Sequence, residues 1–319
     1  MNDQTLAERL IIDCGKVSDI IVDFIRMKVI ENGKDGVCLG ISGGVDSATV
    51  AILSVKAMGD PSRVYGLHLF DRNSQRKFRE HAQKLADELG INFERRDISK
   101  LVEKQGAYKP FLMRAISFSS ILNRLTFNIS KAVYPLFHRE NTFILALRRG
   151  DLSKNRLNRI ATIAKTVEEG FNIRHIERRR ILENYAAEKN LLLVGAANRS
   201  ESFVGWFVKD GIDDLPIEAL LGLYKNQVYQ LAKFLGVPEE ILKEAPSPDM
   251  FKGIGDEDLI GHSYEKIDKV AYVLEHNLSE ETASNEGITL QEFQEIKNLN
   301  QLSTWKRENK HQYPSFAAS

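Results

Sequence analysis

The feature that most constrains how this chain folds is a glycine bend between a short apolar run and a helical segment. Residues 37–41 (VCLGI) are apolar, residues 42–47 read SGGVDS, and residues 46–58 carry a helical pattern. A buried strand that leads through such a bend into a helix is typical of βαβ units. Glycines let the backbone curl and turn its N–H groups inward, and the helix N-terminus adds partial positive charge. The bend therefore predicts an anion site, and phosphate is a common ligand of such sites.

Polar side chains in the bend extend this prediction to a metal-bound phosphate. The hydroxyls of Ser42 and Ser47 add hydrogen-bond donors, and Asp46 is placed to hold Mg²⁺ against phosphate oxygens. The GxxxxGK[ST] pattern of the Walker loop and its lysine are absent from the sequence. The plain structural alternative is a glycine turn in which Asp46 only caps a helix. The complete SGGVDS motif between a strand and a helix favours the phosphate site.

Alternating strand and helix patterns along the chain predict one α/β domain. Residues 4–31 carry apolar side chains at helical spacing and predict one or two helices. Further strands are expected at residues 64–70, 91–98 and 191–195, and further helices at residues 75–89, 172–189, 225–235, 238–244 and 263–277. This order predicts a doubly wound, Rossmann-like parallel sheet with helices on both faces, in a single domain over residues 1–319. The polar tail after Glu286 is expected to wrap around the domain or to fray.

A basic stretch interrupts the alternation and is expected to form a helical insert at about residues 105–168. Residues 107–165 hold 11 Lys or Arg and two acids, and some of their apolar side chains repeat at helical intervals. Charged helical faces are usually solvated, so we favour an amphipathic hairpin whose cations face solvent or a second subunit. The alternative is a lid whose arginines contact substrate phosphates and exclude water. Nucleic-acid binding is not expected, because the insert lacks ordered aromatic platforms.

Composition narrows the class of protein. Hydrophobic residues make up 43% of the 319, enough for a substantial core, and Lys plus Arg balance Asp plus Glu at 44 each. The net charge thus indicates no polyanionic partner. Cys14 and Cys38 are too few and too close in sequence for a secreted disulfide framework. The N-terminus does not resemble a signal peptide, and no apolar run suits a membrane helix. We expect a cytoplasmic protein with no membrane partner.

The motif and its downstream context resemble a known family. ISGGVDS (residues 41–47) resembles the pyrophosphatase (PP) loop shared by NAD synthetases, GMP synthetases, asparagine synthetases and several RNA-thiolating enzymes. Three later segments look like successive parts of NAD synthetase: LLLVGAANRSESFVGWFVKDG (191–211), LLGLYKNQVYQLAKFLGVPEEILKEAPSPDM (220–250) and GDEDLIGHSYEKID (255–268). Matches in this order are much more specific than the loop by itself.

The resemblance implies an adenylation reaction that forms an amide, a ligase activity of NAD biosynthesis. ATP and Mg²⁺ would activate the carboxylate of deamido-NAD as an acyl-adenylate and release pyrophosphate. Ammonia would then attack the adenylate to give the amide and AMP. Such an enzyme stabilises charge on the leaving pyrophosphate and positions two reactants, without a covalent intermediate on the protein.

The residues that serve ATP in the family match well. The resemblance implies that Asp46 and Glu201 bind magnesium and that Lys225 contacts ATP. Ser247 replaces a threonine and keeps its hydroxyl, whereas Ala196 stands where the family usually has threonine. Singly, Glu201 and Lys225 also fit an exposed acid and a solvated cation; together, at the family's spacing, they favour the ATP role. The full ATP set is Gly40, Ile41, Ser42, Gly43, Gly44, Val45, Asp46, Ser47, Ala196, Lys225 and Ser247, and the catalytic set is Asp46, Ser47 and Lys209.

The residues for the dinucleotide match less well. Ile176, Pro216 and Trp305 stand at positions where the family has an arginine, an aspartate and a histidine that serve this half of the site. An isoleucine cannot grip a phosphate or carboxylate as an arginine does. The expected substrate-binding residues are Arg174, Arg178, Lys209 and Lys306, with the two arginines flanking Ile176 as its replacements.

Several alternatives remain open at this point. The acceptor is deamido-NAD or, with the same chemistry, a different carboxylate, because its expected contacts are altered. A non-catalytic nucleotide-binding protein is a third reading, which the retained Asp46 and Glu201 disfavour. We expect free ammonia, or ammonia from a separate protein, as the nitrogen source, because the chain has no room for a glutaminase domain. The resemblance also implies a homodimer.

Overall fold

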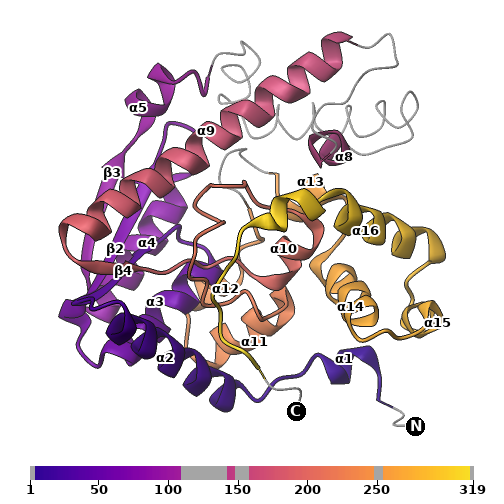
Figure 1. Cartoon of the computed structure of the whole chain (residues 1–319), viewed down its shortest axis with the longest axis horizontal. Coiled ribbons are helices and arrows are strands. Elements are labelled where there is room, and N and C mark those ends of the chain that lie inside the picture. Colours follow the sequence, from indigo (N-terminus) through magenta and orange to yellow (C-terminus); the bar gives the residue numbers. More distant parts are fainter. Residues whose placement is uncertain (1–3, 109–141, 148–157, 248–253, 317–319) are drawn as a thin grey trace.

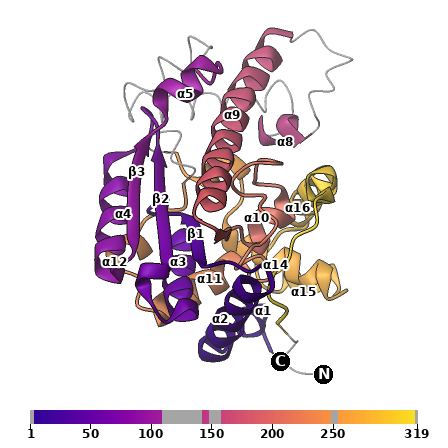
Figure 2. The ribbon, with the colours of Figure 1, turned by 60° about the vertical axis from the view of Figure 1, so that its left-hand side comes forward.

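The protein is built around a four-stranded parallel sheet. The computed structural model describes residues 4–108, 142–147, 158–247 and 254–316. The sheet has the order β3-β2-β1-β4, with every neighbouring pair parallel. Figure 1 labels β2, β3 and β4, and Figure 2 labels β1. Its strands are β1 (Gly36–Gly40), β2 (Val64–Phe70), β3 (Asn92–Asp97) and β4 (Leu191–Leu193). The predicted strands are thus confirmed, and their parallel pairing requires crossover connections on the sheet faces.

Helices cover both faces of the sheet, as the doubly wound prediction requires. One face packs against the helices α2 (Cys14–Glu31), α3 (Val45–Met58) and α4 (Arg76–Leu89), and α11 (Lys225–Phe234) packs on α2 and α3 in the same core cluster. The long helix α9 (Asn158–Glu188) packs on the other face, near α5 (Ser99–Lys104), so that α4 and α9 lie on opposite sides of the strands in Figure 2. A short η1 (Pro61–Arg63) precedes β2. The helix expected at residues 172–189 begins earlier, at Asn158.

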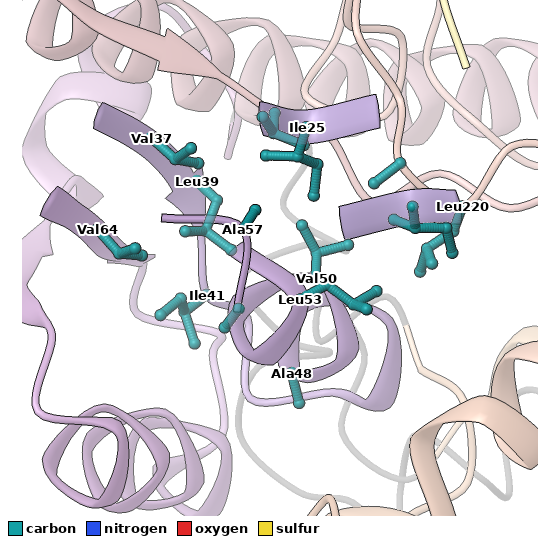
Figure 3. Close-up of a cluster of buried hydrophobic side chains, with 14 of the residues drawn as sticks. Ile25, Val37, Leu39, Ile41, Ala48, Val50, Leu53, Ala57, Val64 and Leu220 are labelled. Carbon is teal, nitrogen blue, oxygen red and sulfur yellow. The ribbon is translucent and has the colours of Figure 1, made fainter. Parts of the chain in front are cut away.

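Alternating side chains of β1 divide the core between these two faces. Val37 and Leu39 point to the cluster that also contains Ile25 and Leu53 (Figure 3). Cys38 lies in the opposite cluster and is fully buried. Neighbouring residues of a strand point to opposite faces of the sheet. A strand that is buried on both faces is therefore apolar at every position, as residues 37–41 are. This burial fixes the strand that leads into the glycine bend.

A second group of helices packs beside the sheet domain (Figure 1). Its members are α1 (Leu6–Arg9), α8 (Thr142–Leu147), α10 (Arg199–Val204), α13 (Asp256–Ile260), α14 (Tyr264–Glu275), α15 (Glu280–Ser284) and α16 (Leu290–Leu302), with η2 (Thr304–Glu308) after them and α12 (Glu239–Leu242) next to α11. Of the two alternatives expected for the tail after Glu286, fraying is wrong, because α16 buries Phe293, Ile296 and Leu299. Thr289 closes a capping box at its start, a signal present in the sequence.

The predicted basic insert falls largely outside the described residues. Residues 109–141 and 148–157 belong to this part, so the amphipathic hairpin and the lid both stay predictions. Among the residues that are described, no helix combines the length and the apolar composition needed to cross a bilayer.

Candidate active site

The loop after β1 is held in a curl by its own polar groups. Gly43 has a φ of +89°, and a Cβ placed there would lie 2.3 Å from the carbonyl oxygen of Phe78. The Ser42 N–H donates to Oγ of Ser47 at 3.1 Å, and the Gly44 N–H donates to Oγ of Ser42 at 3.2 Å. Gly44 is the N-cap of α3, so the curl leads directly into the positive end of a helix dipole. Glycine is required at position 43 for both conformation and space.

A cavity of about 240 Å³ lies over this loop, where the strands β1 and β2 end. Ligands of open parallel sheets bind at this edge. Every residue of the predicted ATP set except Gly43 lines the cavity, and so does Glu201. Leu67, Leu69 and Phe78 add an apolar wall suited to the flat face of a base. The structure therefore brings the lining residues of the segment 40–47 together with Ala196, Lys225 and Ser247, which are up to 207 positions away in the chain.

Lys225 joins the two acids that the sequence assigns to magnesium. Its ammonium donates to Oδ2 of Asp46 at 2.6 Å and to Oε1 of Glu201 at 3.2 Å, and the lysine side chain is only 2% exposed. Burial alone would lower the pKa of Lys225, but the attraction of Asp46, Glu201 and Asp256 outweighs it and raises that pKa. For the acid Glu201 burial acts in the other direction and raises the pKa, although the nearby charge of Lys225 opposes this effect. The cluster thus keeps a fixed cation beside the phosphate loop.

Asn198 orients both acids, a role that the sequence did not reveal. Its side-chain oxygen accepts the backbone N–H of Glu201 at 3.0 Å and so caps α10. Its amide nitrogen donates to Oδ1 of Asp46, also at 3.0 Å. The residue is fully buried. An Asn before a helical segment predicts the cap, but nothing in the sequence predicts the contact with Asp46.

Asp256 adds a third carboxylate to the cavity wall and is more deeply buried than Asp46 and Glu201. Its Oδ2 accepts the hydroxyl of Tyr264 at 3.2 Å, while its buried Oδ1 has no partner among the described residues. Burial raises the pKa of Asp256 to about 6, with Lys225 acting in the opposite direction. An unpaired buried carboxylate oxygen is costly and indicates a missing cation or donor. The acid belongs to a family-like segment, but the sequence reasoning gave it no role.

The two predicted substrate arginines lie at different depths. Arg178 lines the cavity, where its Nε donates to the carbonyl of Leu69 at 3.1 Å and its NH2 lies 3.3 Å from Oδ2 of Asp71. Arg174 is fully buried behind it, over the ring of Tyr108 and 3.7 Å from the same carboxylate oxygen. The structure therefore presents Arg178 to a ligand and does not bring Arg174 to the cavity.

Neither predicted substrate lysine lines the cavity. Lys209 donates to Glu308 at 2.6 Å and to the carbonyl of Trp305 at 3.2 Å. Lys306 donates to the carbonyl of Gly205 at 2.8 Å and also to that of Phe207. Both lysines thus connect the C-terminal η2 to the segment after α10.

The three positions that depart from the family are also apart from the cavity. Ile176 is 42% exposed on α9, and the carbonyl of Pro216 accepts the N–H of Gln312 at 2.8 Å. The indole N–H of Trp305 donates to the carbonyl of Leu147 at 2.9 Å. None of the three lines the cavity described above. The roles of Lys209, Lys306 and Arg174 as substrate contacts stay predictions.

Comparison with known proteins adds a family to this geometry. The family model for NAD synthase matches residues 17–113 and 151–310. An NH(3)-dependent NAD(+) synthetase from Thermotoga neapolitana is 35% identical over 268 residues, which cover 82% of this chain and 85% of that protein. One from Thermococcus sibiricus is 30% identical over 298 residues, covering 93% and 96%.

Solved structures agree on the fold. The NMN synthetase from Francisella tularensis superposes with a TM-score of 0.66 at 24% identity, covering 96% of this chain and 100% of that one. The NH3-dependent NAD synthetase from Campylobacter jejuni, in complex with nitrate, gives 0.62 at 23% identity, covering 94% and 99%. At these identities the likeness concerns the arrangement of helices and strands.

Proposed function

This chain belongs to the NAD synthase family, and on that premise we propose that it converts deamido-NAD to NAD with ATP and ammonia. The carboxylate of deamido-NAD attacks the α-phosphorus of ATP, and pyrophosphate departs. Ammonia then attacks the acyl carbon, and AMP departs. The observation that carries the proposal is one cavity that holds the curled glycine loop together with Asp46, Glu201 and Lys225.

The chain's own groups suit the first step. Pyrophosphate gains charge as it leaves, and the curled loop leads into the N-terminus of α3, where the partial positive charge of the helix would stabilise it. Lys225 adds a cation that is fixed before the reaction, so little reorganisation is needed. Leu67, Leu69 and Phe78 would hold the adenine, and Arg178 would meet the anionic acceptor.

Mg²⁺ is part of the proposal, and the donors present fit it. Asp46 and Glu201 offer carboxylate oxygens, and Asp256 offers an oxygen without a partner in the described part of the chain. No group of three or more His, Cys, Asp or Glu side chains within residues 4–316, as far as these are described, has metal-binding geometry. Mg²⁺ usually takes one or two protein carboxylates and completes its coordination with substrate phosphates and water. When bound, the ion would supply positive charge at the leaving phosphates.

A second candidate keeps the chemistry and changes the acceptor. Ile176, Pro216 and Trp305 replace residues that serve the dinucleotide in the family, and Lys209 and Lys306 are engaged with backbone or Glu308 instead of the cavity. This observation favours testing other carboxylates. We also propose a homodimer, which the family resemblance supports, and free ammonia as the nitrogen source; sizing in solution tests the first of these.

One assay separates these candidates. The protein receives ATP, Mg²⁺ and ammonium with deamido-NAD, nicotinic acid mononucleotide or other carboxylates, and AMP and the amide are followed. Amide formation from deamido-NAD supports the proposal, and turnover of another carboxylate alone supports the second candidate. ATP binding without AMP release from any carboxylate would leave a non-catalytic nucleotide-binding protein. Asp46→Ala serves as the matched inactive control, with turnover lowered on the order of 10²-fold or more.

A further inference from the structure

A histidine–aspartate pair lines the same cavity and has no part in the chemistry described so far. Nδ1 of His175, on α9, lies 2.6 Å from Oδ2 of Asp213, in the segment between α10 and α11. The two side chains are 14% and 35% exposed. Neither residue stood out in the sequence, because they are 38 positions apart and meet only in the fold.

The backbone around this pair is built for close approach. The N–H of Ile212 donates to the carbonyl of His175 at 3.1 Å, which ties the segment to α9. A Cβ added at Gly211 would lie 2.9 Å from Cβ of His175, so glycine is needed for the segment to come this near. These contacts fix the position of Asp213 relative to the imidazole.

The surrounding charges favour the ionised form of Asp213. Burial raises the pKa of Asp213, but His175 and then Arg178 and Lys306 outweigh this effect and lower it. Glu201 and Glu218 are the acids that interact with the same carboxylate.

Nδ1 of His175 lies close to the Asp213 carboxylate, although the contact lacks regular hydrogen-bond geometry. A neutral ring with its proton on Nδ1 would present a lone pair on Nε2. No residue in the described part of the chain hydrogen-bonds to that Nε2. A base that is oriented by an acid and open to a cavity has the arrangement required for proton transfer.

We propose that His175 accepts a proton from ammonium in the cavity and that Asp213 is its positioning residue. The inference rests on the proposed amidation, in which ammonia must arrive as a nucleophile although ammonium predominates at neutral pH. Ammonium has no lone pair, so it cannot attack the adenylate until a base removes one proton. Of the other acids that line the cavity, Asp46 and Glu201 are engaged with Lys225, and Glu244 pairs with Lys77. Asp256 accepts a hydrogen bond from Tyr264 and is among the donors proposed for Mg²⁺.

One proton of NH₄⁺ moves to Nε2 of His175 and leaves NH₃. The nitrogen lone pair forms a bond to the acyl carbon, and the bond from that carbon to the AMP oxygen breaks, with its electron pair leaving on AMP. The nitrogen of the intermediate gives a second proton to the departing AMP phosphate, which yields the neutral amide. His175 returns its proton to solvent.

Hydroxylamine and isotope exchange make the test selective. Hydroxylamine is largely unprotonated at neutral pH and attacks an adenylate without a base. Exchange of labelled pyrophosphate into ATP reports adenylation alone and needs no ammonia. We expect His175→Gln to lower amide formation from ammonium on the order of 10²-fold, the usual contribution of a positioned base. Hydroxamate formation and pyrophosphate exchange should stay unchanged, and Asp213→Asn should show the same selective loss, smaller in size.

The dependence on pH gives a second readout. The deficit of His175→Gln should narrow as pH rises, because a growing share of the ammonium is already deprotonated. The matched control is His311→Gln, which alters a neighbouring His–Asp pair outside the cavity, with Nε2 of His311 3.1 Å from Oδ1 of Asp214. It should leave the ratio of the ammonium and hydroxylamine rates unchanged.

The outcomes distinguish a failure of the proposed role of His175 from a failure of the proposed function. Equal losses with ammonium and hydroxylamine, or a deficit that is constant with pH, would overturn the role of His175 as proton acceptor. Absence of pyrophosphate exchange with deamido-NAD in the unaltered protein would instead reject the proposed acceptor. The comparison of variants would then use the carboxylate that supports exchange, and failure with every carboxylate would reject both proposals.

Discussion

Asp46 is held at both carboxylate oxygens, and the two partners have different consequences. Lys225 forms a charged hydrogen bond to Oδ2, whereas Asn198 donates a neutral hydrogen bond to Oδ1 and so helps to orient the carboxylate. Asn198 also caps α10 through the backbone N–H of Glu201 and so fixes the first turn of the helix that carries this acid. A single neutral side chain therefore orients both acids proposed for magnesium, in the way that outer hydrogen-bond partners orient metal ligands elsewhere.

Replacement of Asn198 by alanine should weaken the site more than the fold. Loss of the cap costs about 1 kcal/mol of unfolding free energy. Loss of the contact with Asp46 should lower turnover by about 10- to 100-fold and raise the Mg²⁺ concentration needed for half-maximal rate. Thermal unfolding and an Mg²⁺ titration of AMP release measure the two effects.

A matched control for this variant is available at another helix. Ser263→Ala removes the N-cap of α14, where the Ser263 side chain accepts the N–H of Lys266 at 3.4 Å. Its stability cost should be similar, with no change in the Mg²⁺ requirement. Equal Mg²⁺ responses of the two variants would mean that Asn198 acts only as a cap.

At the scale of elements, the helix α3 carries glycine at both ends for different reasons. Gly43, before its start, needs a positive φ and has no space for a side chain. Gly59 ends the helix with a φ of +65° and has nothing within 4 Å of an added Cβ. The first glycine therefore serves the loop, and the second serves only the helix end.

Alanine at these two positions should separate strain from function. Both substitutions place a Cβ at positive φ, which costs about 1–3 kcal/mol of unfolding free energy. Gly43→Ala also pushes the loop away from Phe78, so ATP binding measured by calorimetry should fall at least about tenfold. Gly59→Ala should bind ATP normally. If both bind ATP equally well, the curl observed here is not needed for the nucleotide.

Glu218 joins the end of β4 to the segment that carries Asp213. Its carboxylate accepts the N–H of Ala197 at 2.8 Å and that of Leu215 at 2.9 Å. Burial raises the pKa of Glu218 to about 8, although both amide donors act in the opposite direction. A Cβ at Gly195 would lie 2.2 Å from Oε2, so the strand end leaves room for this acid.

This raised pKa predicts how stability changes with pH. Between about pH 4.3, the ordinary value for glutamate in an unfolded chain, and pH 8, the folded form keeps a proton that the unfolded form releases. The free energy of unfolding should therefore fall as pH rises through this window, by up to about 1.4 kcal/mol per unit for this group. Glu218→Gln cannot titrate, so its melting temperature should gain on that of the unaltered protein between pH 5 and 8.

Glu281→Gln, at an exposed position on α15, controls for the loss of one carboxylate. Parallel melting curves for Glu218→Gln and the unaltered protein would show that the two amide donors keep Glu218 ionised throughout. In that case its role would be a charged clamp at the end of β4.

At the scale of the whole molecule, the site is assembled from segments that are far apart in the sequence and meet in the fold. The sequence predicts the loop at 42–47 because the strand before it, the glycine bend and the helix after it each have a local sequence pattern. The sheet and its covering helices followed from the same patterns. The sequence does not predict the Asn198–Asp46 contact or the His175–Asp213 pair. Each joins residues that are far apart in the sequence and come together only in the fold. Asp256 was missed for the same reason.

The C-terminal segment shows this limit most clearly. The resemblance assigned Lys306 to the substrate, yet the fold buries its ammonium against the carbonyls of Gly205 and Phe207. Gln312 pairs further on with Pro216 and Glu218, so this segment borders the one that carries Asp213. A lysine at the position of a substrate-binding lysine in the family can thus hydrogen-bond the backbone that follows α10. Its position in the sequence does not show whether it binds the backbone or the substrate.

Lys306→Met tests which role holds. Methionine keeps the apolar stem but leaves two buried carbonyls without a donor, which should cost about 2–4 kcal/mol of unfolding free energy. Below the unfolding temperature, the KM for the acceptor should be unchanged, because the ammonium does not reach the cavity. Lys209→Met, which breaks an ion pair with a Glu308 side chain that is 62% exposed, should cost at most about 1 kcal/mol. A Lys306→Met protein that melts like the unaltered one but has a raised KM would instead place this lysine at the substrate, and would require η2 to move when the acceptor binds.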